Sequence, residues 1–252
     1  MKRSFTVILV LCALALLALE IIRPTYSPDP TRNQMISTLI SRGVGGALFL
    51  ILIWKSKLNV FGISRDKKAL LCVLPALAVA INNAPIIGLA SGAAKVNGEA
   101  LDIALFALQS VSVALFEECA FRGYLFPLVL EKYRERSVFF SSVIASAVFA
   151  AFHLVNLFVG SSPAATFLQV GYSFLIGGMC AVVLLKTRCI WICIFLHAVY
   201  NFGGMLVPTL GTGRVWDAAT VCITAVLGVT VLLAMLVILS RVTKKEAYAL
   251  YK

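Results

Sequence analysis

Eight long apolar runs, divided by short polar segments, fill most of this 252-residue sequence. A helix needs roughly 20 mostly apolar residues to cross the hydrocarbon core of a bilayer, and every run is close to that length or longer. Charged residues make up only 13% of the chain, whereas a soluble domain has about 25%. The sequence therefore predicts an all-α polytopic transmembrane bundle of about eight helices and excludes a soluble fold. The runs cover residues 5–22, 35–54, 69–91, 101–130, 137–160, 163–185, 189–208 and 218–240.

The polar segments between the runs are too short for a separate soluble domain, so we expect residues 1–252 to form a single transmembrane domain. The pair Asn82-Asn83, followed by Pro85, is expected to break or kink the third run, because proline cannot continue a helix without losing a hydrogen bond. The first run follows two basic residues and has some features of a signal peptide. Its length and its poorly placed cleavage site favour a retained helix.

The net charge of +11 would suggest nucleic acid as a partner of a soluble chain, but here the basic residues concentrate in every second polar segment. Loops rich in Lys and Arg stay on the cytoplasmic side of a membrane. We therefore expect an integral membrane protein, in the cell membrane, with both termini cytoplasmic, the lipid bilayer as a partner and no nucleic acid. The rich segments carry Lys2, Arg3, Lys55, Lys57, Arg65, Lys67, Lys68, Lys132, Arg134, Arg136, Lys186, Arg188, Arg241, Lys244, Lys245 and Lys252, and the alternating segments carry only Arg23, Arg32, Lys95 and Arg214.

The cysteines are expected to be packing residues. Nearly all lie within apolar runs, where a free Cys behaves as a small apolar side chain. The spacing of Cys189 and Cys193 offers two thiols without nearby partners, which makes a poor metal site. We therefore predict neither a disulfide framework nor a cysteine zinc site. The seven are Cys12, Cys72, Cys119, Cys180, Cys189, Cys193 and Cys222.

Three charged residues lie within six positions of the fourth run, where burial in lipid is costly. A charge near the bilayer centre costs at least about 2.5–3.5 kcal/mol. Glu118 and Arg122 are four residues apart, so they share a helix face and can pair. Glu117 is rotated by about 100° from its neighbour and is left without this partner. We expect Glu117 to serve as a general base or acid.

The two histidines of the chain also lie in apolar runs, each with polar or aromatic neighbours one turn away. Phe149, His153 and Asn156 are expected to line one helix face. His197 is followed four residues later by Asn201. The simplest packing places these two polar stripes and the acidic stripe of the fourth run in the interior of the bundle, against one another. The sequence therefore predicts a shared catalytic or transport site rather than isolated structural residues.

Purely structural roles would also account for these residues. A buried histidine is often only structural, and a Glu–Arg pair can simply hold two helices together. Arg42 and Glu20 lie near the ends of their runs, so we expect their side chains to reach the membrane interface.

The three polar stripes resemble, in order, the three motifs of the CAAX prenyl endopeptidase and bacteriocin-processing (CPBP, Abi) family of intramembrane proteases. These motifs are Glu-Glu-x-x-x-Arg-Gly, Phe-x-x-x-His and His-x-x-x-Asn. The resemblance covers a protease-like core of about residues 101–208, and no motif position departs from the pattern. The matching residues are Glu117, Glu118, Arg122, Gly123, Phe149, His153, His197 and Asn201.

The resemblance implies a glutamate-dependent hydrolase. By position, Glu117 would activate a water, and His153 would help to hold and deprotonate it. His197 and Asn201 would stabilise the oxyanion, since a neutral imidazole and an amide can both donate a hydrogen bond. The supporting residues would be Glu118, Arg122, Phe149 and Asn156.

The implied substrate is a membrane-associated peptide or protein, such as a prenylated C-terminal tail or a bacteriocin or pheromone precursor. Family members are often described as metalloproteases, and Glu and His are normal zinc ligands. No His-Glu-x-x-His motif is present, however, so we favour a mechanism without a metal. Two alternatives remain open: a non-catalytic bacteriocin-immunity or scaffold protein of the same fold, and a proton-coupled transporter. The lack of an internal repeat counts against the transporter.

Overall fold

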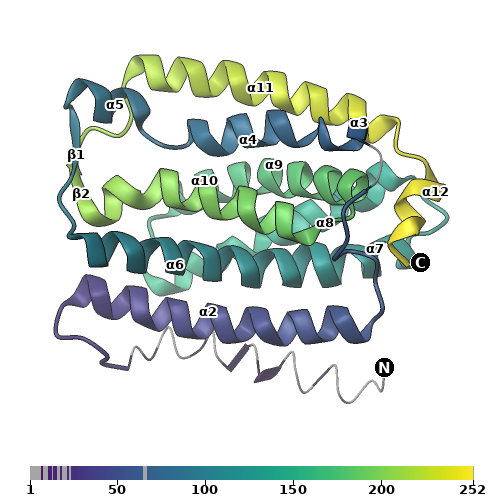
Figure 1. The fold of residues 1–252 in the computed structure, drawn as a ribbon, viewed down its shortest axis with the longest axis horizontal. Coiled ribbons are helices and arrows are strands. Elements are labelled where there is room, and N and C mark those ends of the chain that lie inside the picture. Colours follow the sequence, from purple (N-terminus) through teal and green to yellow (C-terminus); the bar gives the residue numbers. More distant parts are fainter. Residues whose placement is uncertain are drawn as a thin grey trace.

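The computed structural model describes residues 24–64 and 67–251, together with scattered positions between 7 and 22. Within this part, six helical segments are long and apolar enough to cross a membrane. The long helices lie side by side in one bundle (Figure 1). The predicted helical membrane bundle is therefore confirmed. The six segments are Pro30–Lys55, Ala100–Lys132, Val138–Phe158, Pro163–Thr187, Ile190–Leu210 and Ala218–Ser240.

The remaining two apolar runs have different outcomes. The first run lies mostly outside the described residues. The third run forms short helices instead of one span: α3 (Lys67–Leu70), α4 (Val73–Asn82) and α5 (Ile86–Ser91). Helix α4 ends at Asn82 and Pro85 directly precedes α5, so the predicted break is confirmed. Proline has no N–H to continue the hydrogen-bond ladder of α4.

Helix α2 (Pro30–Lys55) packs along α6 (Ala100–Glu117). It begins behind Asp29, whose side chain accepts a hydrogen bond from a first-turn N–H. Gly46 lets the two helices approach closely, because a Cβ there would lie only 2.8 Å from Leu115 Cγ. This close approach places the middle of α2 beside the last turn of α6.

The span that begins with α6 does not remain an ordinary α-helix. From Glu118 to Leu125 it widens into a π-helix, η1, and it then continues as α7 (Phe126–Lys132). π-Helical turns are rare and occur mostly at functional sites. Gly123 lies on this turn where a Cβ would collide with Ile53 of α2. The π-helix is therefore packed tightly into the bundle.

The other spans complete the bundle around this segment. Helix α8 (Val138–Phe152) packs against α9 (Pro163–Thr187) and is followed by the 3₁₀-helix η2 (His153–Val159). Helix α10 (Ile190–Leu210) packs against α6 and α4, and α11 (Ala218–Ser240) lies along α4 and α9 (Figure 1). Only 11% of the most apolar window of α11 is buried. Its apolar surface therefore faces lipid.

The bundle has two distinct ends (Figure 1). At one end, which we call the ribbon end, β1 (Ala94–Val96) pairs antiparallel with β2 (Gly211–Gly213). At the other, which we call the C-terminal end, α12 (Lys244–Ala247) and the 3₁₀-helix η3 (Tyr248–Tyr251) fold back over α7. There the Tyr248 hydroxyl donates a hydrogen bond of 2.9 Å to a backbone carbonyl of α7.

Among the described residues, members of the two alternating groups of basic residues lie at different ends of the bundle. Lys95 lies in β1 at the ribbon end, and Arg32 forms an ion pair there with Asp102. Lys186 lies at the C-terminal end, where its ammonium group is 2.9 Å from the Glu246 carboxylate. The charge asymmetry is thus a property of the folded bundle.

Acid should weaken the attachment of the C-terminal segment. Hydrogen bonds from the Thr243 backbone and from Lys186 hold the pKa of Glu246 below its ordinary value. A depressed folded-state pKa contributes stability that is present above the unfolded pKa and lost as pH falls through the folded pKa. We expect Glu246→Gln to lower the melting temperature in detergent at pH 7. This difference should begin to shrink as pH falls below the ordinary glutamate pKa of about 4.3 and vanish once pH falls through the lower pKa of folded Glu246. A difference that persists unchanged in acid would contradict the ion pair.

Candidate active site

His197 of α10 lies between the carboxylates of two consecutive residues, at the junction of α6 and η1. Its Nδ1 is 2.7 Å from Glu118 Oε1, and its Nε2 is 3.7 Å from Glu117 Oε2. All three side chains are at most 8% exposed. The acidic motif and the third motif therefore meet, as the sequence predicted.

The ion pair predicted between Glu118 and Arg122 is confirmed. Their closest N–O distance is 3.1 Å, and both side chains are almost completely buried. The Arg122 guanidinium also lies over the ring of Phe149, 3.9 Å from its centroid. A Cβ at Gly177 would lie 3.1 Å from this guanidinium, so α9 closes over the pair. Glu118 faces this cation as a carboxylate, and a carboxylate only accepts hydrogen bonds. His197 therefore donates its Nδ1–H to Glu118.

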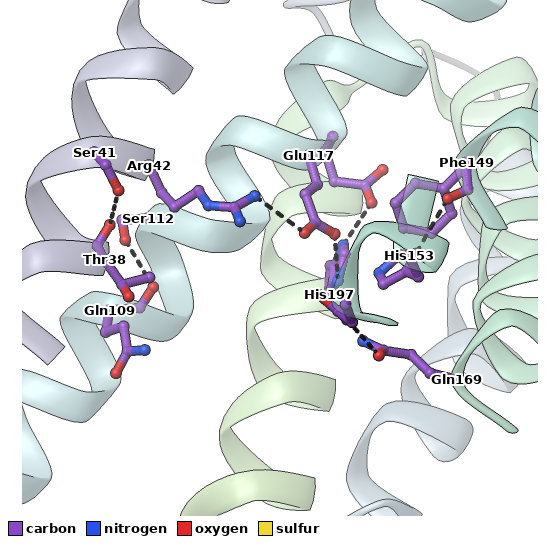
Figure 2. Close-up of polar contacts among 12 residues, drawn as sticks. Thr38, Ser41, Arg42, Gln109, Ser112, Glu117, Phe149, His153, Gln169 and His197 are labelled. Carbon is purple, nitrogen blue, oxygen red and sulfur yellow. Dashed lines mark hydrogen bonds and ion pairs between the residues drawn. The ribbon is translucent and has the colours of Figure 1, made fainter. Parts of the chain in front are cut away.

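His153 is held by the carbonyl of Phe149, one turn earlier. The Nδ1–O distance is 3.1 Å, and because a carbonyl only accepts, Nδ1 carries the proton. The Nε2 atom of a neutral His153 is then left as an acceptor. The rings of His153 and His197 both meet the Phe149 ring edge-to-face, at centroid distances of 5.0 Å and 6.2 Å. Figure 2 shows both histidines beside Glu117, and His153 and Glu117 interact electrostatically.

Arg42 of α2 points into the site, so the expectation that it reaches the membrane interface was wrong. Its Nη1 is 3.7 Å from Glu117 Oε1, and only 17% of its side chain is exposed. The guanidinium lies 5.1 Å from the centroid of the Phe116 ring (Figure 2 shows the side chain directed at Glu117). The sequence left Glu117 without a cationic partner, but in the structure Arg42 is that partner. The partner was missed because it belongs to another apolar run, and the helix contact that joins the two runs is not visible in sequence spacing.

Helix α8 ends at Phe152, and the chain continues as the tighter 3₁₀-helix η2. His153 and Asn156 are three residues apart within η2, and residues at this spacing share a face of a 3₁₀-helix. The Asn156 amide donates a hydrogen bond to Gln169 Oε1 of α9, at 2.7 Å. Asn156 therefore anchors η2 to α9, behind His153.

Asn201 lies one turn beyond His197 on α10 and lines a cavity of about 510 Å³ between α2, α6 and α10. Its position on the same helix face as His197 follows from the four-residue spacing. This cavity is polar along part of its wall, where Gln109 and Ser110 of α6 face Asn201 across it.

The residues that the structure describes include no group of three His, Cys, Asp or Glu side chains arranged to hold a metal ion. The cysteines are free thiols, and Cys189 and Cys193 are fully packed in the core. The reactive constellation therefore consists of carboxylates, imidazoles and guanidinium groups from α2, α6, η1, α8 and α10.

One comparison with known proteins gives a match. A family model described as "Type II CAAX prenyl endopeptidase Rce1-like" matches residues 99–203, a range that contains every motif position discussed above. No curated protein and no solved structure matches the chain.

Breaking the buried ion pair should destabilise the bundle. In Glu118→Gln, the Arg122 guanidinium stays buried without its counter-ion, which typically costs about 3–5 kcal/mol. We expect a clearly lower melting temperature in detergent. Arg134→Gln, which removes the exposed pair with Glu131, is the matched control and should change the free energy of unfolding by less than about 1 kcal/mol. Equal melting temperatures for Glu118→Gln and the wild type would disprove the structural role of the pair.

Proposed function

Because residues 99–203 match the model of the Rce1-like family of type II CAAX prenyl endopeptidases, we propose that the protein is an intramembrane endopeptidase acting on a membrane-associated peptide or protein. One observation carries the proposal: Glu117 and two histidines from three separate helical segments meet in a buried site at membrane depth. Charges and imidazoles buried together in a membrane bundle mark function far more often than structure.

Glu117 is the proposed general base. The Arg42 guanidinium lies 3.7 Å from the Glu117 carboxylate and holds it in position to take a proton from water. The Nε2 atom of His153 accepts a second hydrogen bond from the same water and so orients it. The hydroxide then attacks the carbonyl carbon of the scissile bond, and Glu117 passes its proton to the leaving amine.

The oxyanion of the tetrahedral intermediate needs hydrogen-bond donors. Asn201 supplies an amide N–H. Because the Nδ1–H of His197 is directed to Glu118, a neutral His197 has no proton at Nε2. His197 therefore donates only as an imidazolium, whose positive charge the ionised Glu118 stabilises. This refines the sequence-based expectation of a neutral donor.

The proposed mechanism uses no metal ion. The support is electrostatic: the Arg42 guanidinium already lies 3.7 Å from the Glu117 carboxylate and would repel a divalent cation bound there. Candidate substrates are a prenylated C-terminal tail and a bacteriocin or pheromone precursor, all of which bring a scissile peptide to the bilayer surface.

Glu117→Gln should abolish hydrolysis while leaving the fold intact. The amide cannot take a proton from water, so we expect a loss in kcat of about 10²–10⁴-fold. The assay compares a fluorogenic farnesylated peptide with an unprenylated leader peptide, with and without a chelator, and the melting temperature reports folding. Activity of Glu117→Gln equal to wild type would remove Glu117 from the mechanism. Loss of wild-type activity in the chelator would contradict the metal-free part.

Arg42 is a proposed positioning residue for Glu117. In Arg42→Ala the Glu117 carboxylate loses its ion pair with α2, and a misplaced base costs on the order of 10²-fold in kcat. We expect little change in KM, and partial recovery in Arg42→Lys, which keeps the charge without the planar guanidinium. A rise in KM at constant kcat would instead indicate that Arg42 binds substrate.

A further inference from the structure

The cavity beside Asn201 extends from the ribbon end into the bundle. Its wall is formed by the first turns of α2, the stretch of α6 from Phe106 to Val113 and the later turns of α10. Pro30 begins α2 and Thr209 is the penultimate residue of α10, so the cavity reaches the ribbon-end termini of both helices. Its volume of about 510 Å³ is in the range of ligand sites.

Two of the three helices that form the cavity wall, α6 and α10, also carry reactive groups one turn beyond the cavity. On α6, Val113 lines the cavity and Glu117 lies four residues further along the same face. On α10, Asn201 lines the cavity and His197 lies four residues before it. The inner end of the cavity is therefore one helical turn from both reactive groups.

The third wall follows the same pattern. On α2, Gln34 lines the cavity, and steps of four residues along its face lead to Thr38 and then to Arg42. Figure 2 shows Thr38, Ser41 and Arg42 on the side of α2 that faces α6. A polar stripe on a membrane-spanning helix thus runs from the cavity to the cation beside Glu117.

The lining of the cavity fits a peptide rather than a lipid chain. Gln109 Oε1 is buried and accepts no hydrogen bond within the described structure, a situation that is costly unless water or a ligand satisfies the oxygen. Together with Gln34 and Asn201, it presents amide donors and acceptors that complement a peptide backbone. A second cavity of about 390 Å³, beneath α11, is lined mostly by apolar side chains and lacks this character.

The distribution of charge identifies which side of the membrane the cavity faces. Among the described residues, the ribbon end carries Arg32, Lys95 and Arg214, whereas Arg134, Lys186 and Lys244 from the segments rich in Lys and Arg lie at the other end. Under the positive-inside rule the ribbon end is extracytoplasmic.

We propose that this cavity is the substrate path, and that the protein cleaves a peptide segment presented from the extracytoplasmic side rather than a cytoplasmic tail. This inference rests on the proposed peptidase function. The amides of the cavity bind the extended peptide backbone, and its inner end delivers the scissile bond to Glu117 and Asn201.

Cysteine accessibility tests the path without requiring catalysis. Gln109 and Leu108 are neighbours on α6, about 14 Å from its ribbon-end start, but Leu108 is 57% exposed on the lipid side. In a background with the exposed Cys12 and Cys222 replaced by Ala, a charged, membrane-impermeant thiosulfonate is added to intact cells. Only a hydrated thiol ionises and reacts, so Gln109→Cys should be modified at least about ten-fold faster than Leu108→Cys. Gln34→Cys is a second reporter within the cavity.

Glu131→Cys, at the C-terminal end, should react only after the cells are permeabilised. The reverse pattern, with Glu131→Cys labelled from outside and both cavity reporters only from inside, would overturn the extracytoplasmic path. No labelling of either reporter from either side would overturn the hydrated cavity itself.

Modification of Gln109→Cys from outside should also reduce peptide hydrolysis at least about ten-fold, because the bulky adduct displaces the substrate from its productive position. The Cys12→Ala, Cys222→Ala background should keep its activity under the same reagent. Undiminished hydrolysis after complete modification would overturn the path while leaving the proposed peptidase function standing. Labelling from outside in a protein that hydrolyses no peptide would instead overturn the proposed function.

Discussion

The site depends on the cost of burying charge in a membrane. Glu118 and Arg122 are almost fully buried, and neither is tolerable alone at bilayer depth. Glu118 Oε1 faces both the Arg122 guanidinium and His197 Nδ1, and Arg122 is stacked on Phe149. Through these contacts a single ion pair fixes the orientation of two further motifs. The π-helix that carries the pair is therefore a part of the site's construction, since its junction with α6 holds the carboxylates of Glu117 and Glu118 against one imidazole.

A second charged group reaches the site from a helix outside the matched family region. Residues 99–203 match the family model, whereas Arg42 belongs to α2. Its reach depends on the glycine contact between α2 and α6, which brings the two helix axes close enough for the guanidinium to meet Glu117. The protease-like core and the helix beside it are thus coupled by both packing and charge.

The same three helices that supply Arg42, Glu117 and His197 also line the polar cavity, because residues four apart on a helix share a face. The proposed hydrolysis requires both water and a polar peptide inside a low-dielectric bundle. Amide side chains along one continuous surface meet that requirement without exposing backbone groups to lipid. The asymmetric distribution of basic residues distinguishes the two ends of this surface.

The sequence by itself determined the membrane bundle, the break near Pro85, the Glu118–Arg122 pair and the meeting of the three motifs. These follow from hydropathy, from proline chemistry and from four-residue spacing, which are local properties. Only the tertiary structure decided the partner of Glu117, the early end of α8 before Asn156 and the course of the cavity. Each of these depends on which faces of distant helices pack together. Close packing contacts between helices, such as Gly46 against Leu115, decide which faces meet. The spacing of residues along the sequence does not reveal these contacts.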